Sequence, residues 1–171
     1  ASPQEGLLLP LRPMHADDHA LPSGNSVAVR ALAKLWALTG AEEYRAPAEA
    51  ASRVFAGAMS EHVFPHAGMI SAALALQTPL CAVISGGDAA GREELRAALR
   101  DLSAPLHVLI VADTADLPPQ HPAYGKNSGA EAAVWLCTAG RCLAPVTSVR
   151  TFREMVRAER QGQHRPPAND E

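Results

Sequence analysis

The sequence has few aromatic residues, few cysteines and no strong excess of charge. Of its 171 residues, 4% are aromatic, and the formal net charge is −3. This composition does not indicate a basic phosphate-binding surface or a set of rings for base stacking, so no nucleic-acid partner is expected. No apolar run approaches the roughly 18 residues of a membrane span, and residues 1–6 lack the pattern of a signal peptide. We therefore expect a cytoplasmic protein with no membrane partner.

The cysteine count is low and odd, which is not typical of a disulfide framework. The three cysteines are Cys81, Cys137 and Cys142. Cys137 and Cys142 flank a predicted hairpin turn, across which their Cα atoms could approach to the disulfide range of about 4.4–6.8 Å. Two interpretations remain open, namely inert or structural thiols that pack as small apolar residues, and a redox pair or half of a metal site. No second cysteine pair completes a zinc site, so no metal is predicted.

Proline and N-cap residues divide the first half of the chain into an irregular segment and helices. Residues 1–22 contain four prolines and predict an irregular segment. Capping side chains at residues 23–26, followed by apolar residues at helical spacing, predict a helix that ends at Gly40. We expect a second helical stretch over residues 41–59, either starting or kinked at Pro47, and a third over residues 65–77. Together they resemble the last members of a helical-hairpin array.

The second half changes to a pattern of short buried strands. Apolar runs at residues 80–84 and 106–111 enclose an amphipathic helix, which predicts a βαβ unit with parallel strands. A third strand is expected at residues 132–137, with a hairpin into residues 142–144. Ser148 is predicted to cap a last helix that runs to about residue 158. The fold class is therefore mixed α and β, with a helical part at residues 1–78, an α/β segment at 79–159, and a polar, disordered tail at 160–171.

The glycine-rich turn at residues 85–91 lies between a strand and a helix, where a dinucleotide fingerprint would be found. Asp88 occupies the position of the middle glycine, and its carboxylate would repel a pyrophosphate at the helix N-terminus. Asp88 is therefore predicted to be an N-cap. No cofactor is predicted for this chain.

The most informative polar string spans residues 17–26. A turn followed by a capped helix start explains some of these residues, but it does not require all of them. Carboxylate, hydroxyl and amide side chains are also the groups that bind sugar hydroxyls through paired hydrogen bonds. The candidates for contact with a sugar-like ligand are Asp18, Ser23 and Asn25, with Arg12 as a weaker one. His15 and His19 are four residues apart, but the nearby prolines favour a polar loop over a metal-binding helix.

Two strings carry a resemblance to a known family. They are Asp18–Ser26 (DHALPSGNS) followed by Leu38-Thr39-Gly40, and Ala133–Cys137 (AVWLC) followed by Cys142–Thr147 (CLAPVT). In order and spacing they resemble the C-terminal part of the thioredoxin-domain-containing, spermatogenesis-associated protein family, over roughly residues 12–158. His19 departs from the family pattern, in which this position is usually glycine. The chain also contains no thioredoxin-like domain.

The resemblance implies the last helices of an (α/α)6 barrel of the N-acylglucosamine 2-epimerase and six-hairpin glycosidase kind, closed by a small α/β segment. The expected function is that of a carbohydrate-related C-terminal fragment that is not catalytic alone. Any sugar epimerase activity would belong to the full-length protein, because no acid–base pair for proton transfer is recognisable in this chain. The expected partners are a sugar-like small molecule and the upstream domains. The alternatives are a non-catalytic interaction module with exposed apolar surface, and a thiol redox role of Cys137 and Cys142.

Overall fold

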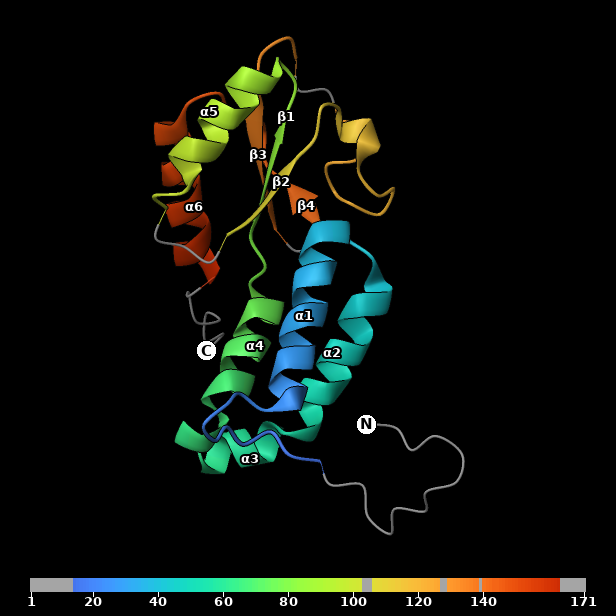
Figure 1. Ribbon diagram of the computed structural model, residues 1–171, viewed down its shortest axis with the longest axis vertical. Helices are drawn as coiled ribbons and strands as arrows, with labels where there is room; N and C mark the ends of the chain where they lie inside the picture. Colours follow the sequence, from blue (N-terminus) through green and yellow to red (C-terminus); the bar gives the residue numbers. More distant parts are fainter. Residues whose placement is uncertain (1–13, 103–105, 127–128, 139, 164–171) are drawn as a thin grey trace, which may run out of the picture.

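The computed structural model describes residues 14–102, 106–126, 129–138 and 140–163 (Figure 1). Within these ranges the chain forms six α-helices and one four-stranded mixed sheet, so the predicted mixed α and β class is confirmed. A helical half and an α/β half follow one another along the long axis of the molecule (Figure 1). The helical half contains α1 (Gly24–Thr39), α2 (Glu42–Val54), α3 (Ala56–Glu61), the 3-10 helix η1 (Phe64–His66) and α4 (Ala67–Gln77).

The α/β half begins directly after α4. Its elements are β1 (Cys81–Ser85), α5 (Ala89–Leu99), β2 (His107–Ile110), the 3-10 helix η2 (Thr114–Asp116), β3 (Ala133–Thr138), β4 (Arg141–Cys142) and α6 (Val149–Gln163). Helix α6 extends beyond the predicted end near residue 158, so residues 160–163 of the predicted tail are helical. The remainder of that tail, residues 164–171, lies outside the described residues, as do residues 1–13.

Helix α1 is the central element of the helical half. It packs against both α2 and α4, and the shared core includes the fully or nearly fully buried side chains of Val29, Trp36 and Met69. Ala33, Ala48 and Ala72 are also buried there, and such small side chains let helices approach closely. The predicted start and end of α1 are confirmed by Ser23 as the N-cap and Gly40 as the left-handed C-cap.

The helix break expected at Pro47 lies elsewhere. Helix α2 starts at Glu42 rather than at the proline, and Pro47 lies within it. The cost is limited, because Pro47 withholds one N–H from the carbonyl of Glu43, near the helix start. The helical stretch is interrupted instead at Phe55, whose N–H donates to the Ser52 carbonyl at 3.3 Å before α3 begins.

The sheet has the strand order β2-β1-β3-β4. Strands β1 and β2 are parallel and are joined through α5, which confirms the predicted βαβ unit. Strand β3 is antiparallel to β1 and to β4, and the second pairing confirms the predicted hairpin. The segment between β2 and β3 contains η2.

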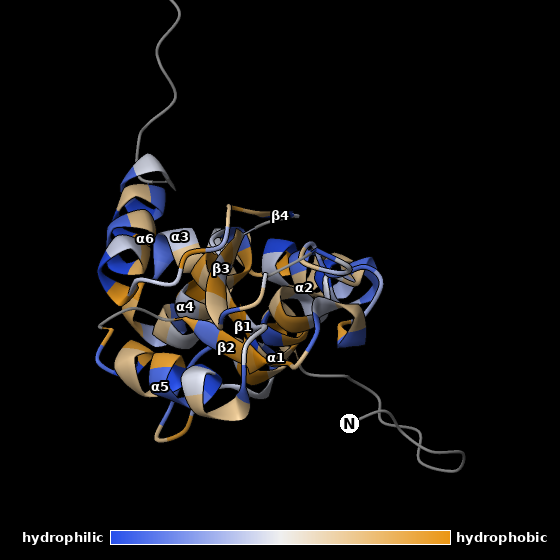
Figure 2. Ribbon diagram, turned by 90° about the horizontal axis from the view of Figure 1, so that it is seen from above, coloured by the Kyte–Doolittle hydropathy of each residue, from blue (hydrophilic) through white to orange (hydrophobic). Residues whose placement is uncertain are grey.

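Alternation along the strands separates two cores, one on each face of the sheet. Ala82, Ile84 and Leu136 face α5 and α6, where they pack against Leu95 and Phe152. The opposite face is covered by the loop that contains η2 (Figure 1). Its core consists of Cys81, Val83, Leu117, Ala123, Trp135 and Cys137. Figure 2 shows the hydrophobic strands at the centre of the α/β half. In the described part of the chain, no helix is long and apolar enough to cross a membrane.

Candidate functional site

Asp18 connects the polar loop at residues 14–23 to the starts of two helices. Its carboxylate accepts the Ser23 N–H at 2.9 Å and the Gly68 N–H, in the first turn of α4, at 2.6 Å. Its own N–H donates to the Pro65 carbonyl at 2.5 Å. These two backbone donors lower the pKa of Asp18 below its ordinary value. A Cβ atom at residue 68 would lie 2.7 Å from the carboxylate oxygens, so glycine is required for this contact.

The other predicted sugar contacts also hydrogen-bond within the chain. The buried Ser23 hydroxyl accepts the Ser26 N–H at 3.1 Å and donates to the Ser26 hydroxyl at 3.0 Å. The Asn25 side-chain amide donates to the His15 carbonyl at 2.6 Å. Asp18, Ser23 and Asn25 therefore hold the loop in place. Their contact with a sugar stays a prediction, and Arg12 lies outside the described residues.

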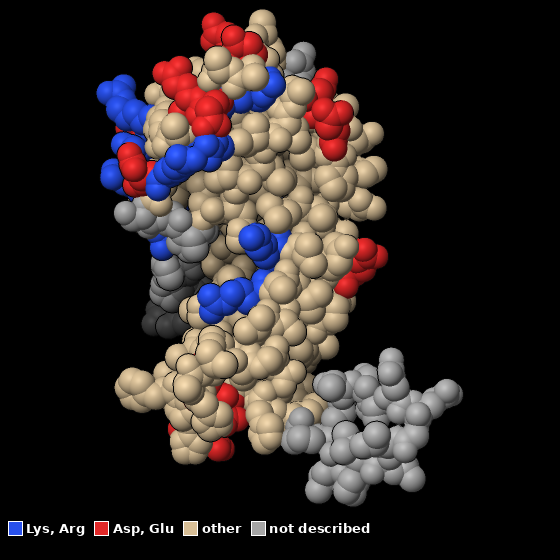
Figure 3. All heavy atoms as spheres, viewed as in Figure 1, with Lys and Arg blue, Asp and Glu red and all other residues tan. Residues whose placement is uncertain are grey.

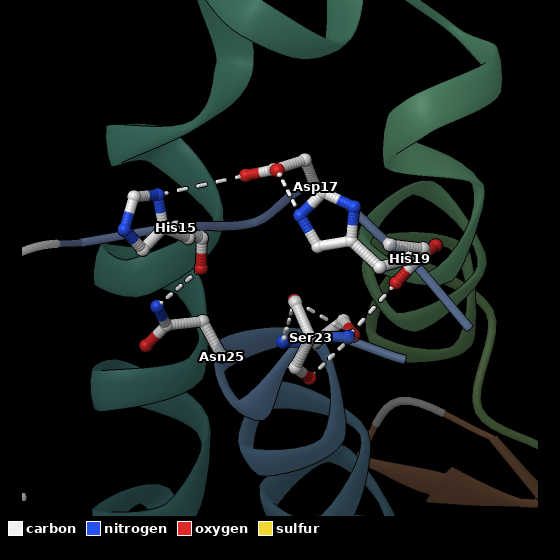
Figure 4. A network of polar contacts seen from close by, with 7 residues as sticks. His15, Asp17, His19, Ser23 and Asn25 are labelled. Atoms are coloured by element: carbon white, nitrogen blue, oxygen red, sulfur yellow. Dashed lines mark hydrogen bonds and ion pairs between the residues drawn. The ribbon is translucent and has the colours of Figure 1, made fainter. Parts of the chain in front are cut away.

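Beside Asp18, Ser23 and Asn25 lies a more exposed group of side chains, namely His15, Asp17 and His19 (Figure 4). Asp17 Oδ2 is 3.0 Å from His19 Nε2, and Asp17 Oδ1 is 3.7 Å from His15 Nδ1. The two histidine side chains are 71% and 84% exposed. The group lines a shallow hollow of about 470 Å³, together with residues 20–24. The segment is a loop, as predicted, and no group of three or more metal-ligating side chains suited to a metal ion occurs among the described residues.

The three cysteines lie in one row across the sheet. Cys81 of β1 is directly opposite Cys137 of β3, and Cys137 is directly opposite Cys142 of β4. Cys137 and Cys142 form a disulfide with their Cα atoms 3.9 Å apart, which is below the expected range of about 4.4–6.8 Å, whereas Cys81 is a buried free thiol. Directly opposite residues present their side chains on the same face of a sheet. We refer to Cys81, Cys137 and Cys142 as the cysteine row.

The two ends of the cysteine row differ in accessibility. Cys81 and Cys137 are each 2% exposed, and Cys142 is only partly buried. Burial raises the pKa of the Cys81 thiol to about 12, so this group is protonated at neutral pH. A cavity of about 180 Å³ between α1 and the sheet is lined by Cys81 and Cys137, with Trp36 and Gln120 among its other walls.

The sequence interpretation considered Cys137 and Cys142 as a pair but missed the position of Cys81. A hairpin is a local feature, whereas the pairing of β1 with β3 joins segments that are far apart in the chain. One signal was present, because Cys81 is the second residue of its predicted strand and Cys137 is the last residue of its own. Antiparallel pairing of those two strands brings such positions together.

His121 is a second titratable group that the sequence did not single out. It is 2% exposed, and its Nδ1 accepts the Ala123 N–H at 3.1 Å. Its Nε2 has no hydrogen-bond partner among the described residues. Burial lowers the pKa of His121, so the neutral ring is favoured. This histidine belongs to the loop that covers the face of the sheet with the cysteine row.

Comparisons of the chain with protein-family models, with curated proteins and with solved structures found no match.

Proposed function

We propose that the chain works as a reversible thiol–disulfide module whose redox pair is Cys137 and Cys142. The observation that carries the proposal is a disulfide between directly opposed residues of a hairpin, of which Cys137 is buried and Cys142 is only partly buried. We also propose a cytoplasmic setting, where disulfides are usually transient, catalytic or regulatory rather than structural. In that setting a reversible bond fits better than a permanent staple.

The co-reactant is a low-molecular-weight thiol of the glutathione type. Its thiolate attacks the sulfur of Cys142, the less buried residue of the pair, which forms a mixed disulfide and releases the Cys137 thiolate. A second thiolate attacks the sulfur of the bound small molecule. The small molecule leaves as its own disulfide, and Cys142 leaves as a thiolate that takes up a proton. Two electrons have then passed from the small thiols to the protein.

Reduction would act mainly on β4, which has few other attachments. This strand comprises Arg141 and Cys142, and the Arg141 side chain pairs with Glu159 of α6 at 2.6 Å. The Leu143 N–H donates to the Leu136 carbonyl at 2.9 Å just beyond the disulfide. Opening the disulfide therefore leaves a short edge strand held by a few polar contacts. A redox signal would thus be converted into a local loosening of this edge.

The test is an equilibrium thiol count in glutathione buffers of graded ratio, followed by acid quenching, alkylation and mass spectrometry. We expect a transition from one free thiol, Cys81, to three free thiols within the range of cytoplasmic buffers. The Cys137→Ser variant is the control, because it cannot form the pair. Three free thiols in the most oxidising buffer would contradict the proposal, as would an unreduced bond in the most reducing one.

A second candidate function is binding of a polyhydroxylated ligand at the hollow beside the loop, as the family resemblance implies. The supporting observation is the accessible carboxylate of Asp17 between two exposed histidines. In this proposal the chain supplies the last helices of an (α/α)6 barrel in a longer, carbohydrate-related protein. Asp18, Ser23 and Asn25 then position the loop, while Asp17 and His19 face the ligand.

Binding is tested by titrating the chain, and the longest natural form that contains it, with an N-acylglucosamine in NMR or calorimetry. The Asp17→Asn variant should weaken binding severalfold, because a charge-assisted hydrogen bond to a hydroxyl is lost. Asp101→Asn, on the exposed turn after α5, is the matched control and should bind as the parent does. Equal affinity of the Asp17 variant and the control for the sugar would show that the loop is not the binding site.

A further inference from the structure

The strand order places Cys137 between the two other cysteines. Since β3 lies between β1 and β4, Cys81 approaches Cys137 from one side and Cys142 is bonded to it on the other. Displacement at a disulfide sulfur proceeds with the attacking and leaving sulfurs on opposite sides of the central sulfur. The sheet therefore arranges a nucleophile, a central sulfur and a leaving group in the order that thiol–disulfide exchange requires.

We propose that Cys81 is a resolving thiol that displaces Cys142 from its disulfide with Cys137. The disulfide then joins Cys81 of β1 to Cys137 of β3. This inference rests on the proposed reversible chemistry of the Cys137–Cys142 pair. The Cys81 thiol loses its proton to solvent, and its thiolate forms a bond to Cys137 Sγ. The bond from Cys137 to Cys142 breaks, and Cys142 leaves with the electron pair and takes up a proton. One disulfide and one thiol are present before and after the step, so no oxidant is consumed.

The spacing of β1 and β3 suits the new bond. The Leu143 N–H to Leu136 carbonyl bond marks that pair as hydrogen-bonded across β3 and β4, so the adjacent Cys137–Cys142 pair is not hydrogen-bonded. The polar backbone groups of Cys137 consequently face β1. Opposed residues of this hydrogen-bonded kind have Cα atoms about 5.5 Å apart. That value lies within the usual range for a disulfide, about 4.4–6.8 Å.

The surroundings set the rate of migration and determine what it exposes. The cavity beside Cys81 and Cys137 leaves space for the side-chain rotation that sulfur exchange needs. Because burial keeps the Cys81 thiol protonated, exchange is slow at neutral pH and accelerates as pH rises. Migration replaces a buried thiol at Cys81 with a partly accessible thiol at Cys142. The product is a partly accessible nucleophile that can attack an oxidised small thiol or a disulfide of another protein.

Three serine variants of the full chain separate the possible bonds. In glutathione disulfide buffer, Cys142→Ser should form an internal Cys81–Cys137 disulfide, detected as a loss of two hydrogens and by peptide mapping. Cys137→Ser is the matched control, because Cys81 and Cys142 are two strands apart, about 10 Å, and should not bond to each other. Far-UV circular dichroism checks that each variant is folded. A folded Cys142→Ser variant in which both thiols stay unlinked would overturn the proposal.

Labelling of the oxidised wild-type protein gives a readout that does not depend on variant folding. Under native conditions N-ethylmaleimide should label Cys142, at a rate that rises about tenfold per pH unit below the pKa of Cys81. Oxidised Cys81→Ser has no attacking thiol and should stay unlabelled. Label on Cys81 alone would overturn the proposal. If the glutathione titration is reversible while these two tests fail, only the migration is wrong. If the titration itself fails, the proposed function is wrong.

Discussion

Asp18 illustrates how one polar residue can be read in two ways. Its position in a string of sugar-compatible side chains suggested a ligand contact, whereas its carboxylate accepts two backbone N–H groups that begin different helices. The residue types were visible in the sequence. The second acceptor contact, to Gly68, was not, because it spans 50 positions of the chain. Capping by residues close in sequence, as by Ser23 and Asp88, was predicted correctly because donor and acceptor are neighbours.

The lowered pKa of Asp18 predicts an acid-sensitive contribution to stability. The unfolded chain binds a proton here more readily than the folded chain does, so stability increases with pH through this range. The contribution is complete above the ordinary pKa of 3.8 and is lost as pH falls through the lower folded value. Asp18→Asn should therefore lower the melting temperature at pH 6 and lose that difference near pH 2. A difference in melting temperature that does not depend on pH would contradict this role of the Asp18 carboxylate. Asp17→Asn is the comparison variant.

His121 predicts a second and separate pH effect. Its folded pKa lies below the ordinary value of 6.5, because burial disfavours the charged ring. The unfolded chain then binds the extra proton, so stability should fall as pH decreases through 6.5 towards the folded pKa. His107 has a pKa lowered by burial and by Lys34, and it acts in the same direction. In urea unfolding, the free energy of unfolding should decrease less between pH 8 and pH 5 for His121→Asn than for the parent. It should decrease less again when His107→Asn is added. An equal decrease for His121→Asn and the parent would show that His121 is not the cause.

The helices and strands show which signals are local. Caps, apolar periodicity and the parallel βαβ unit were predicted within a few residues, because each depends on short stretches of chain. The break at Phe55 was missed, since the proline at position 47 drew the prediction towards a residue that the helix accommodates. The antiparallel neighbour of β1 was also unpredictable. Strand order depends on which faces are covered by α5, α6 and the loop that contains η2, and these segments lie far apart in sequence.

Gly40, which follows α1, lies close to the loop that contains η2, and it offers a sharp test of this packing. Its φ is +72°, and an added Cβ would lie 2.3 Å from the Gln120 carbonyl oxygen. Gly40→Ala should therefore destabilise the protein by about 1–3 kcal/mol, through backbone strain and displacement of the loop. Gly57 in α3 is the matched control, because a Cβ there meets nothing within 4 Å. Gly57→Ala should be neutral or stabilising by about 0.5–1 kcal/mol, as measured by urea unfolding.

The molecule as a whole has an uneven distribution of charge and apolar surface. In the view of Figure 3, charged side chains gather over the half that contains α5 and α6. At the other end, the segment 63–66 is tied to the polar loop through the Asp18–Pro65 hydrogen bond. Phe64 is 92% exposed there and Leu21 is 78% exposed. If these side chains form one contiguous apolar patch, it would mark a surface that another part of a protein covers.

In the proposal that the chain supplies the last helices of a barrel, the preceding helices would cover such a surface. We therefore expect the chain alone to associate as its concentration rises, as measured by analytical ultracentrifugation. The double variant Leu21→Ser and Phe64→Ser should shift the association to severalfold higher concentrations. Val108→Thr, on the edge strand β2, is the control and should associate as the parent does. A monomer at all concentrations, with no binding of a hydrophobic dye, would argue against a covered surface at this end.

The central position of Cys137 has a further consequence in polymer terms. The bond to Cys142 closes a small covalent ring, with a sequence separation of 5, which constrains the unfolded chain only locally. A bond to Cys81 would instead enclose α5, β2 and the loop that contains η2 in one large ring. In the chain-entropy description, the larger ring raises the free energy of unfolding by about 2 kcal/mol more than the small one. Depending on its position, the same disulfide would then either constrain only the hairpin turn or stabilise the α/β half against global unfolding and proteolysis.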